Sequence, residues 1–423
     1  MYIHVVNRGE TLWQIANYYN TDIGEIITAN GLINPNQLLV GQALLIPTED
    51  IYYTVENGDT AWKIADKFGV SIQELLWLNK IMFPDLIYPG IVLSIPKKSK
   101  PNIEVNGFTY MLGMSAVPIV NELGEYLTYL CPFAYVIKED GGLQTIDDSP
   151  AINAAVSSNV TPMMSVTNFT ITSRGENLAH VVLNNPETVN KLQINILNIM
   201  KLKGYEGLNI DFENVLPEDR IAYNNFLKST VERLHREGYF VSTSLAPKIS
   251  KEQKGLLYEA HDYEEHGKIA DFVILMTYEW GFRTGPPQAI SPINEIRKVL
   301  NYAVTVIPRN KILMGFQIYA RDWVIPHIDG QVAETLSMQG AIARAVKYNV
   351  VIRYDYKSQS PFYHYTDEEG KAHEVWFEDA RSAQSKFDLV KEYDLRGISY
   401  WALGYPFPQN WVLLEDNFNI LKR

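Results

Sequence analysis

The sequence lacks most features of disulfide-bonded, membrane-spanning and nucleic-acid-binding proteins. Its 423 residues include one cysteine, Cys131, so no disulfide can form within the chain. That cysteine lies in the apolar run from Leu130 to Ala134, where we expect a buried and unreactive thiol. The formal net charge is −12, and an acidic surface repels phosphate backbones and anionic lipid. We therefore expect no nucleic-acid partner.

Long apolar runs are also missing. None approaches the ~18 residues of a membrane-spanning helix, so no membrane span is expected. The segment from Met1 to Val6 has neither the basic nor the apolar stretch of a secretory signal, and we expect no signal peptide. What the chain has is an ordinary apolar fraction of 46% and 12% aromatic residues. This composition predicts a sizeable core, with a minority of aromatic rings free to stack on sugar faces.

An internal repeat organises the N-terminal part of the chain. Matching residues recur at a constant offset of 49 positions, which predicts two copies of one small fold. In each copy the pattern predicts strand, helix, helix and strand, with Thr11 and Thr60 as helix N-caps. We place the copies at residues 1–48 and 51–97. The matched pairs are Gly9 and Gly58, Thr11 and Thr60, Trp13 and Trp62, Ile15 and Ile64, Asn30 and Asn79, Pro35 and Pro84, and Pro47 and Pro96.

This repeated pattern resembles the LysM domain, a βααβ module that binds glycans containing N-acetylglucosamine, such as peptidoglycan and chitin. The resemblance implies that the glycan lies between the loop after the first strand and the loop after the second helix. The glycan-binding residues so implied are Gly9, Glu10, Thr11, Asn34 and Pro35 in the first copy and Gly58, Asp59, Thr60, Phe83 and Pro84 in the second. We expect Trp13 and Trp62, with the Ile-Ala pairs that follow them, to be core residues.

The rest of the chain predicts an α/β fold. The polar stretch from Lys97 to Asn102 contains a proline and is predicted to be a linker. Beyond it, β-rich runs alternate with helical stretches, which predicts a (β/α)8 TIM barrel over residues 103–423. A doubly wound open sheet is the alternative. The expected strands are Tyr110 to Met114, Phe133 to Ile137, Pro162 to Thr167, Gly207 to Phe212, Phe240 to Leu245, Phe272 to Tyr278, Ile312 to Tyr319 and Gly397 to Leu403.

One long interruption separates the last two expected strands. The stretch from Arg321 to Asp379 is too long for a single helix, and it contains β-like pieces. We predict a small α+β insertion at about residues 321–379, lying over the mouth of the barrel.

Strict alternation marks the segment from Glu206 to Asn214. The apolar set is Leu208, Ile210 and Phe212, and the polar set is Asn209, Asp211 and Glu213. On a barrel strand the apolar set faces the helices, so the polar set points inward. Glu213 then lies at the C-terminal rim, where barrel enzymes place their active sites.

Two carboxyls on one buried face affect each other's ionisation. Asp211 and Glu213 are two residues apart, about 6.5 Å between Cα atoms, so a charge on one raises the pKa of the other. A protonated carboxyl beside a charged one is the arrangement that glycosidic cleavage requires. From spacing alone, a solvated strand end with incidental acids is the alternative.

The same segment resembles the Asp-x-x-Asp-x-Asp-x-Glu signature of the family 18 glycoside hydrolases. Further motifs of that family follow in order: Met276 and Tyr278 in the sixth expected strand, Tyr319 in the seventh, and Trp401 in the eighth. The resemblance implies a retaining, substrate-assisted mechanism that needs no metal and no cofactor. In it, Glu213 protonates the glycosidic oxygen and the substrate's own 2-acetamido oxygen attacks the anomeric carbon.

The family also implies the roles of the neighbouring residues. Asp211 orients the acetamido group, Tyr278 hydrogen-bonds to it, and Trp401 forms an apolar floor beneath the sugar. The other substrate-binding residues implied are Asn209, Met276 and Tyr319. The chain departs from the family at four positions, Glu206, Asn209, Glu279 and Gln317, where Asp, Asp, Asp or Asn, and Pro are usual.

Paired LysM-like repeats before a divergent barrel resemble the spore cortex-lytic N-acetylglucosaminidases of spore-forming bacilli. That resemblance implies a peptidoglycan hydrolase that cleaves β-1,4 bonds after N-acetylglucosamine during germination and is located in the spore, in the cortex, the coat or at the surface. The partner it implies is peptidoglycan or another glycan containing N-acetylglucosamine. A chitinase or an endo-N-acetylglucosaminidase is one alternative, and a non-catalytic, lectin-like wall-binding protein is another.

Overall fold

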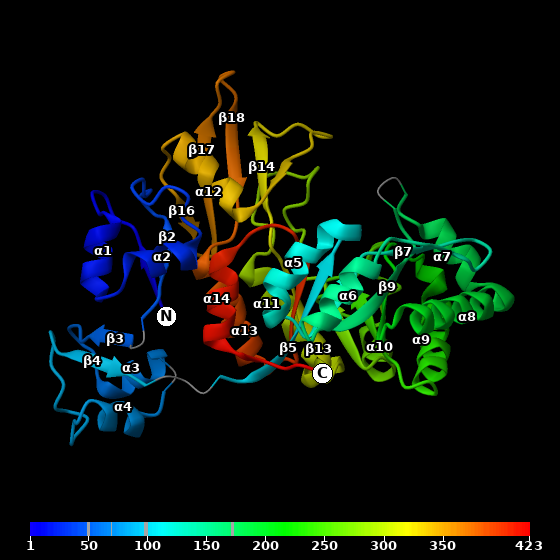
Figure 1. Cartoon of the computed structure of the whole chain (residues 1–423), viewed down its shortest axis with the longest axis horizontal. Helices are drawn as coiled ribbons and strands as arrows, with labels where there is room; N and C mark the ends of the chain where they lie inside the picture. Colours follow the sequence, from blue (N-terminus) through cyan, green and yellow to red (C-terminus); the bar gives the residue numbers. More distant parts are fainter. Residues whose placement is uncertain (49–50, 69, 97–99, 171–172) are drawn as a thin grey trace.

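The computed structural model describes residues 1–48, 51–68, 70–96, 100–170 and 173–423. Figure 1 shows two small N-terminal units in blue, a barrel in cyan to red, and an antiparallel sheet above the barrel. Residues 97–99 of the expected linker lie outside the described residues. The expected linker also extends too far, because Asn102 is the first residue of a barrel strand.

Within the described ranges, eight parallel strands close into a ring. The ring is closed because β19 pairs with β5 and β9 pairs with β10, all in parallel. The predicted TIM barrel is therefore confirmed, and the open doubly wound sheet is wrong. The barrel strands are β5 (Asn102–Thr109), β6 (Tyr129–Pro132), β9 (Thr161–Thr167), β10 (Gly207–Asp211), β11 (Phe240–Leu245), β12 (Phe272–Leu275), β13 (Ile312–Gln317) and β19 (Gly397–Leu403).

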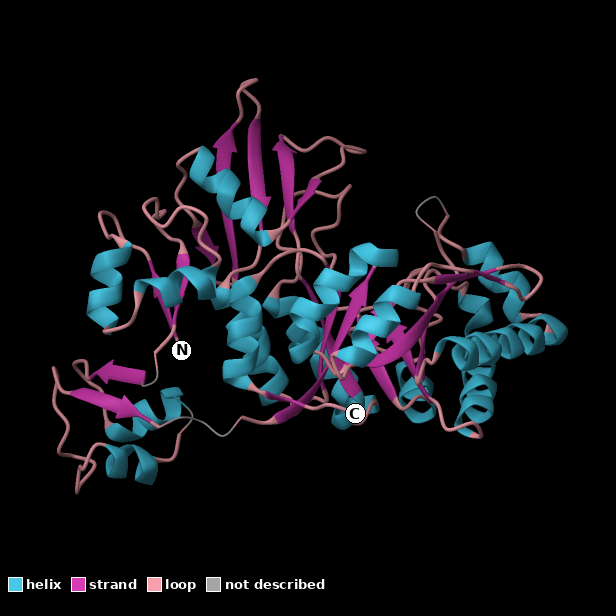
Figure 2. Cartoon of the chain, viewed as in Figure 1, coloured by secondary structure: helices cyan, strands magenta, loops and turns pink. Residues whose placement is uncertain are grey.

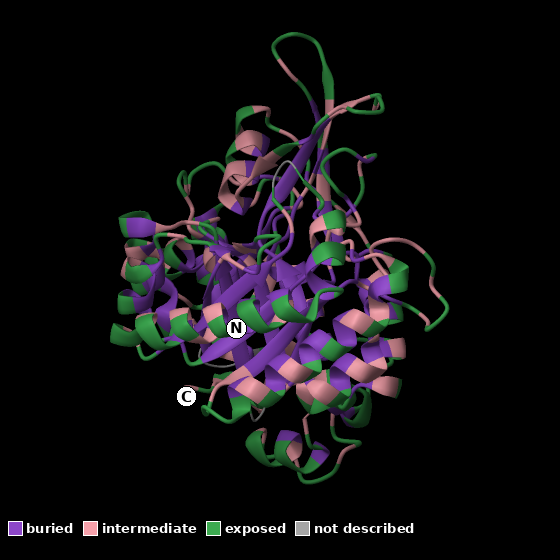
Figure 3. Cartoon of the chain, turned by 90° about the vertical axis from the view of Figure 1, so that its right-hand side faces the viewer, coloured by how far each residue is buried: buried purple, intermediate pink, exposed green. Residues whose placement is uncertain are grey.

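Helices surround this ring. They are α5 (Ala116–Leu123), α6 (Ser149–Ser157), α7 (Glu176–Leu183), α8 (Pro186–Lys203), α9 (Arg220–His235), α10 (Tyr263–Ile269), α11 (Ile293–Val306), α13 (Ala380–Glu392) and α14 (Pro408–Asn417). Three short strands, β7 (Tyr135–Ile137), β8 (Leu143–Gln144) and β20 (Asn419–Ile420), pair at the edges of the ring. Figure 3 shows the buried strands beneath helices that are exposed on their outer faces.

Two of the expected strands are misplaced. The first barrel strand is β5, not Tyr110 to Met114, because Glu104 and Asn106 made the true strand look polar. Glu104 is buried against Arg396 (2.5 Å), and Asn106 donates to Ser399 (2.9 Å). The expected second strand, 133–137, is divided between β6 in the ring and β7 outside it.

The alternation along β10 separates two apolar layers. Leu208, Ile210 and Phe212 pack among the residues of α7, α8 and α9, as predicted. A second cluster fills the inside of the ring, and it includes the buried thiol of Cys131. Burial raises the pKa of that thiol well above its usual value, which agrees with an unreactive side chain.

Along the chain, a five-stranded antiparallel sheet is inserted between β13 and α13. In space it lies above the barrel (Figure 2). Its order is β15-β14-β18-β17-β16, and its helix α12 packs Met338, Ala341 and Ala345 into the main apolar cluster. The bounds are β14 (Ala320–Ile325), β15 (Glu334–Leu336), α12 (Met338–Lys347), β16 (Arg353–Asp355), β17 (Ser360–Thr366) and β18 (Ala372–Trp376). This is the small α+β insertion that the sequence predicts.

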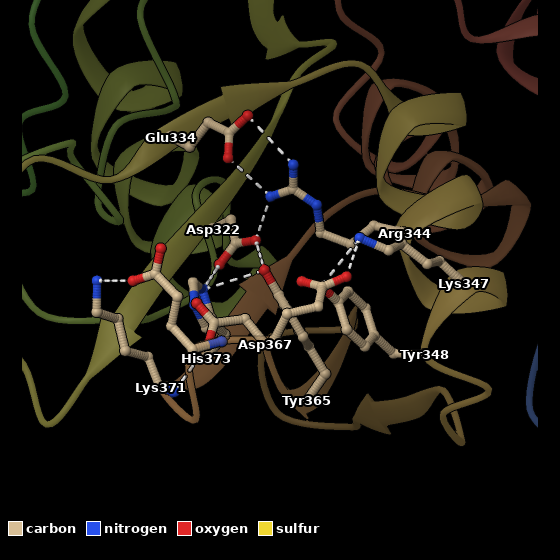
Figure 4. Close-up of polar contacts among 11 residues, drawn as sticks. Asp322, Glu334, Arg344, Lys347, Tyr348, Tyr365, Asp367, Lys371 and His373 are labelled. Carbon is tan, nitrogen blue, oxygen red and sulfur yellow. Dashed lines mark hydrogen bonds and ion pairs between the residues drawn. The ribbon is translucent and has the colours of Figure 1, made fainter.

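A buried ionic cluster joins this sheet to α12 (Figure 4). Asp322 on β14 accepts a hydrogen bond from Tyr365 (2.7 Å), contacts His373 (2.8 Å) and pairs with Arg344. Arg344 also binds Glu334 (2.8 Å). Because Asp322 is buried, its charge needs these partners. The cluster therefore fixes β14, the strand that joins the insertion to the barrel rim.

The two N-terminal units have the predicted βααβ order. The first contains β1 (Tyr2–Val5), α1 (Leu12–Tyr19), α2 (Ile23–Asn30) and β2 (Ala43–Ile46); the second contains β3 (Ile51–Thr54), α3 (Ala61–Phe68), α4 (Ile72–Leu78) and β4 (Val92–Ile95). Thr11 caps α1 in a capping box with Gln14, and Thr60 accepts a hydrogen bond from the Lys63 backbone (3.1 Å). Both predicted caps are present.

The prediction that both tryptophans are core residues is wrong. Trp13 is 65% exposed and Trp62 is 61% exposed. Each lies in the first turn of its helix, and the Ile-Ala pair behind it, Ile15 and Ala16 in the first unit, takes the buried face instead. A helix turns about 100° per residue, so residues two positions apart face different sides.

The first N-terminal unit is docked on the barrel and its insertion (Figure 1). Gln409, at the start of α14, donates to Ala43 O (2.9 Å) and to Asn30 Oδ1 (2.7 Å). The Ile352 amide of the insertion donates to Val40 O (2.9 Å). These bonds connect backbone and buried side chains, so this unit is a fixed part of the molecule.

Replacing Gly41 by alanine tests this docking. The new Cβ would lie 1.9 Å from Ile352 O, whereas the counterpart Gly90→Ala meets nothing within 4 Å. Both glycines have positive φ, +84° and +93°, so both variants carry the same backbone strain of about 1–2 kcal/mol. We expect Gly41→Ala to lower the Tm of the barrel by at least roughly 2 °C more than Gly90→Ala does. Scanning calorimetry measures both, and equal losses would contradict the docking.

Candidate active site at the barrel rim

The polar face of β10 supplies the centre of the site. Asn209 and Asp211 are buried inside the ring, and Glu213 follows two residues beyond the strand end, half-buried. Two serines of the neighbouring strand β11 hold Asn209. Ser242 donates to its Oδ1 (2.9 Å), and its Nδ2 donates to Ser244 Oγ (3.1 Å). The inward placement of Asn209, Asp211 and Glu213 is as the alternation predicts.

The other predicted site residues follow the C-terminal ends of neighbouring strands. Met276 and Tyr278 come directly after β12, Tyr319 follows β13, and Trp401 lies on β19. The carboxyl ends of parallel barrel strands meet at one rim, so these residues surround Glu213. Met276 and Tyr319 are buried, while Tyr278 and Trp401 keep part of their surface exposed.

Burial raises the pKa of both carboxyls, and neighbouring negative charges raise that of Glu213 further. Burial raises the pKa of Asp211 from 3.8 to about 7, against a weaker lowering by its hydrogen bond to Ser244. For Glu213, burial, then the charge on Asp211 and then the charge on Glu279 raise the pKa from 4.5 to about 8. Near neutral pH Glu213 is therefore a carboxylic acid that can donate a proton.

The same charges act on Tyr278. Burial, followed by the charges of Asp211, Glu213 and Glu279, raises the pKa of its hydroxyl well above the ordinary value. The phenol therefore stays protonated and is available as a hydrogen-bond donor beside the two acids.

A third carboxyl at the rim is held by the insertion. Glu279 has a positive φ of +65° and accepts hydrogen bonds from Tyr319 and from Arg321 Nη2 (2.7 Å). Arg321 is buried on β14, where it also stacks on Tyr319, 4.7 Å from the ring centre. The insertion therefore contributes a positive charge that fixes Glu279 beside the acid.

An aromatic wall borders the site. The Trp401 ring meets Phe133 edge-on with centroids 4.7 Å apart, and it lies 5.7 Å from Phe108. Its exposed part offers a flat apolar surface, and flat apolar surfaces suit the C–H faces of sugar rings.

Several polar residues of the site were not among the sequence-based candidates. They are Asn168, Ser242, Ser244, His261 and Arg321. The serines could have been found, because Ser242 and Ser244 lie two residues apart and so share one face of β11, as the polar set does on β10. The other three lie outside regular alternation, and no local sequence pattern marks them.

The glycan-binding residues expected in the first N-terminal unit line two different hollows. Gly9 and Glu10 line one of them, with His4 and Tyr18. Asn34 lines another, between this unit and the barrel. Pro35 is half-buried, and Thr11 is used as a helix cap.

Glu10 and its counterpart Asp59 have a structural task as well. Glu10 accepts a hydrogen bond from the Asn7 backbone (2.7 Å), and Asp59 accepts one from the Glu56 backbone (2.9 Å). Each carboxylate therefore braces the loop after the first strand of its unit. The remaining predicted residues of the second unit have exposed or half-buried side chains; they are Gly58, Thr60, Phe83 and Pro84.

The rim is equipped for acid-catalysed cleavage at a sugar. It combines one protonated carboxyl, a second carboxyl two residues away on the same strand, a phenol and an apolar floor. Within the described parts of the chain, no group of three or more His, Cys, Asp or Glu residues is arranged to hold a metal ion. None of the helices in those parts is long and apolar enough to cross a membrane.

Comparisons with known proteins agree with this geometry. The model of the glycosyl hydrolases family 18 matches residues 119–405, and the LysM domain model matches residues 4–47 and 53–96. The chain is 48% identical to the cortical fragment-lytic enzyme of Bacillus subtilis (strain 168), covering 100% of this chain and 99% of that protein. Its fold is similar to crystal structures of the spore cortex-lytic enzyme SleL. The TM-score is 0.91 with 41% identity for Bacillus cereus, covering 100% of this chain and 98% of that one. It is 0.89 with 42% identity for Bacillus megaterium, covering 100% and 99%.

The raised pKa values predict how stability depends on pH. The folded protein binds protons at Asp211 and Glu213 that the unfolded chain has already released, so stability falls as pH rises from about 4 to about 8. We expect Asp211→Asn to flatten this dependence and to have a higher Tm than the parent at pH 8. The control is Asp388→Asn, which removes an exposed carboxyl from α13. Thermal unfolding at pH 5 and pH 8 measures the effect. Parallel pH profiles for parent and Asp211→Asn would show that Asp211 is not a buried, high-pKa acid.

Proposed function

The chain belongs to family 18 of the glycosyl hydrolases and is a glycoside hydrolase with two LysM domains, and we propose that it degrades spore cortex peptidoglycan during germination. We propose further that it is an N-acetylglucosaminidase that cleaves β-1,4 bonds after N-acetylglucosamine. The observation that carries the proposal is the placement of Glu213 beside the buried Asp211 at the barrel rim, where burial raises the pKa of both carboxyls.

The choice of substrate is supported by similarity over the whole chain. The relatives named for lysis of cortex or cortical fragments match both LysM domains and the barrel, at 47–48% identity. The chitinase structures with comparable folds match about three quarters of the chain at 22–26% identity. We therefore favour cortex peptidoglycan as the substrate and the spore as the site of action, with chitin as the substrate to be tested against it.

The proposed reaction retains the anomeric configuration. Glu213 donates its proton to the glycosidic oxygen, and the acetamido oxygen of the sugar attacks the anomeric carbon as the bond breaks. Asp211 orients the acetamido group and stabilises the positive charge that develops on it, while the Tyr278 hydroxyl donates a hydrogen bond to it. Trp401 supports the sugar from below, and Asn209, Met276 and Tyr319 complete the pocket. Water then opens the cyclic intermediate, with Glu213 as the base.

The position of Asp211 argues against an enzyme carboxylate as the nucleophile. Asp211 and Glu213 project from one face of one strand end, whereas a nucleophilic carboxylate must reach the sugar from the side opposite the acid. The substrate's own acetamido group can reach that side. This requirement also explains why N-acetylated sugars are the proposed substrates.

The LysM domains are proposed to hold the enzyme on the glycan. Two linked binding modules gain from their high effective concentration. The second domain presents Phe83, 61% exposed, on the loop after α4, where the family binds its glycan. The first domain is fixed to the barrel, so it is proposed to set the direction in which the glycan approaches.

The proposed function is tested by digesting cortex peptidoglycan and chitin oligosaccharides in parallel and identifying the products by mass spectrometry. We expect cortex products that end in N-acetylglucosamine, and much slower cleavage of chitin. Glu213→Gln should lose activity by at least about 100-fold on both, because an amide cannot donate the proton. Chitin cleaved as fast as cortex would favour the chitinase alternative, and a fully active Glu213→Gln would remove Glu213 from the mechanism.

The stereochemistry of the first product tests the substrate-assisted mechanism. Cleavage of a β-linked substrate should release the β-anomer first, which proton NMR detects before mutarotation. A thiazoline analogue of N-acetylglucosamine, which mimics the cyclic intermediate, should inhibit. Release of the α-anomer would mean inversion, and the roles given to Asp211 and Tyr278 would be wrong.

Binding by the second LysM domain can be separated from catalysis. Phe83→Ala should reduce the fraction of protein that sediments with insoluble cortex, while cleavage of short soluble fragments stays unchanged. Leu202→Ala is the control, because it removes a side chain that is 83% exposed from α8, away from both LysM domains. Undiminished sedimentation of Phe83→Ala would exclude Phe83 from the binding surface.

A further inference from the structure

The backbone that carries Glu213 lies beyond the paired part of its strand. The last residues paired between β9 and β10 are Thr167 and Asp211. Phe212 and Glu213 therefore extend past the ladder, at the point where the acid must be held in one orientation. Asn214, with a φ of +52°, turns the chain away from the strand direction.

Two buried side chains take over where the ladder ends. We propose that Asn168 and His261 are positioning residues that fix the direction of the Glu213 carboxyl by binding the backbone of Phe212 and Glu213. The inference rests on the proposed role of Glu213 as the acid.

Asn168 pairs with Glu213 as a neighbouring strand would. It follows Thr167 directly, and it is 1% exposed. Its Nδ2 donates to Glu213 O (2.8 Å), and its Oδ1 accepts from Glu213 N (2.9 Å). Its Nδ2 also donates to Gly175 O (3.1 Å), which ties the pair to the loop after β9. One amide thus satisfies both backbone groups of the acid.

The same pairing occurs in both LysM domains. In the first LysM domain, Asn30 donates to Leu45 O (2.6 Å) and accepts from Leu45 N (2.7 Å). In the second, Asn79 pairs with Ser94 at 2.6 Å in both directions. In both domains the amide holds one residue of a strand in place, and Asn168 has the same geometry at the active site.

His261 holds the preceding peptide from the other side. Its Nδ1 accepts a hydrogen bond from the Ala246 backbone (2.7 Å), so the ring proton lies on Nε2, which donates to Phe212 O (2.9 Å). The ring is 1% exposed, and burial lowers its pKa to about 4, so it stays neutral. Ala246 follows β11, so His261 links the end of β11 to the end of β10.

The two side chains together fix three backbone groups in a row. Those groups are the Phe212 carbonyl, the Glu213 amide and the Glu213 carbonyl. With both flanking peptide planes fixed, the Cα–Cβ bond of Glu213 has one direction. Small displacements of a reacting group reduce rates strongly, so loss of either contact should weaken proton donation more than substrate binding.

The test compares two substrates that differ in their need for a proton. A β-N-acetylglucosaminide with a sugar leaving group needs the acid, whereas the 2,4-dinitrophenyl glycoside does not, because dinitrophenolate leaves unprotonated. We expect Asn168→Ala and His261→Ala to lower kcat on the sugar substrate by at least about tenfold, with KM within about twofold. On the dinitrophenyl substrate kcat/KM, which excludes the later step in which Glu213 is the base, should fall less than about threefold. Asn168→Asp keeps the acceptor for the Glu213 amide and should recover part of the loss.

Two controls make the outcomes distinct. Asn79→Ala removes the same pairing from the second LysM domain and should leave both rates unchanged. Glu213→Gln should lose far more kcat/KM on the sugar substrate than on the dinitrophenyl substrate, because kcat/KM excludes the later step in which Glu213 is the base; if it loses equally on both, the role of Glu213 as the acid is wrong. Suppose that Glu213→Gln loses more on the sugar substrate, as expected. The positioning role is then overturned if the Asn168 and His261 variants lower the rates on both substrates equally, or if they lower neither rate. Should Asn168→Ala fail to fold, the ratio of the two rates in Asn168→Asp decides.

Discussion

Asp211 and Glu213 project from one face of a buried strand end, where neither carboxyl has the water that ordinarily stabilises its charge. The closed barrel imposes this arrangement, because alternate residues of β10 must point inward once Leu208, Ile210 and Phe212 pack on the helices. Burial raises the pKa of both carboxyls, and the charge on Asp211 raises that of Glu213 further, so both keep their protons to higher pH. This burial reduces the stability of the folded protein near neutral pH, and it produces a carboxylic acid that is still neutral there.

Much of the surrounding structure restrains that strand end or adjusts its charge. Serines of β11 hold Asn209, and Asn168 and His261 hold the backbone on either side of Glu213. The insertion adds Arg321, which forms an ion pair with Glu279. The charge on Glu279 still raises the pKa of Glu213. Its own ionic cluster around Asp322 fixes β14, so the position of Arg321 depends on contacts well outside the site.

The outer parts of the molecule are connected to the same rim. The first LysM domain accepts a hydrogen bond from Gln409, at the start of α14. Helix α14 follows β19, and β19 carries Trp401. The domain is also bonded to Ile352 of the insertion. A glycan held by this domain would therefore have a defined position relative to the barrel rim, which a flexibly tethered module would not provide.

The sequence predicted the parts of this account that depend on local periodicity or on motifs. The barrel, the repeat and the inward face with Glu213 were predicted, and strands β11 and β19 were predicted with their bounds. The first barrel strand was missed because buried Glu104 and Asn106 resemble a linker. The tryptophans were misplaced because a helix turns about 100° per residue, which puts Trp13 and Trp62 on the outer face. Asn168 and His261 could not be predicted, because each acts on residues 45 or 49 positions away that the fold alone brings near.

The central claim is that Glu213 is a carboxylic acid near neutral pH, and its own titration tests this most directly. Carbon-13 NMR of protein labelled at glutamate side-chain carboxyls, with Glu213→Gln to assign the resonance, measures that titration. The structure predicts a midpoint near pH 8 for Glu213. A midpoint near the ordinary 4.5 would mean that Glu213 is ionised at neutral pH, and the account of the site as an acid catalyst would be wrong.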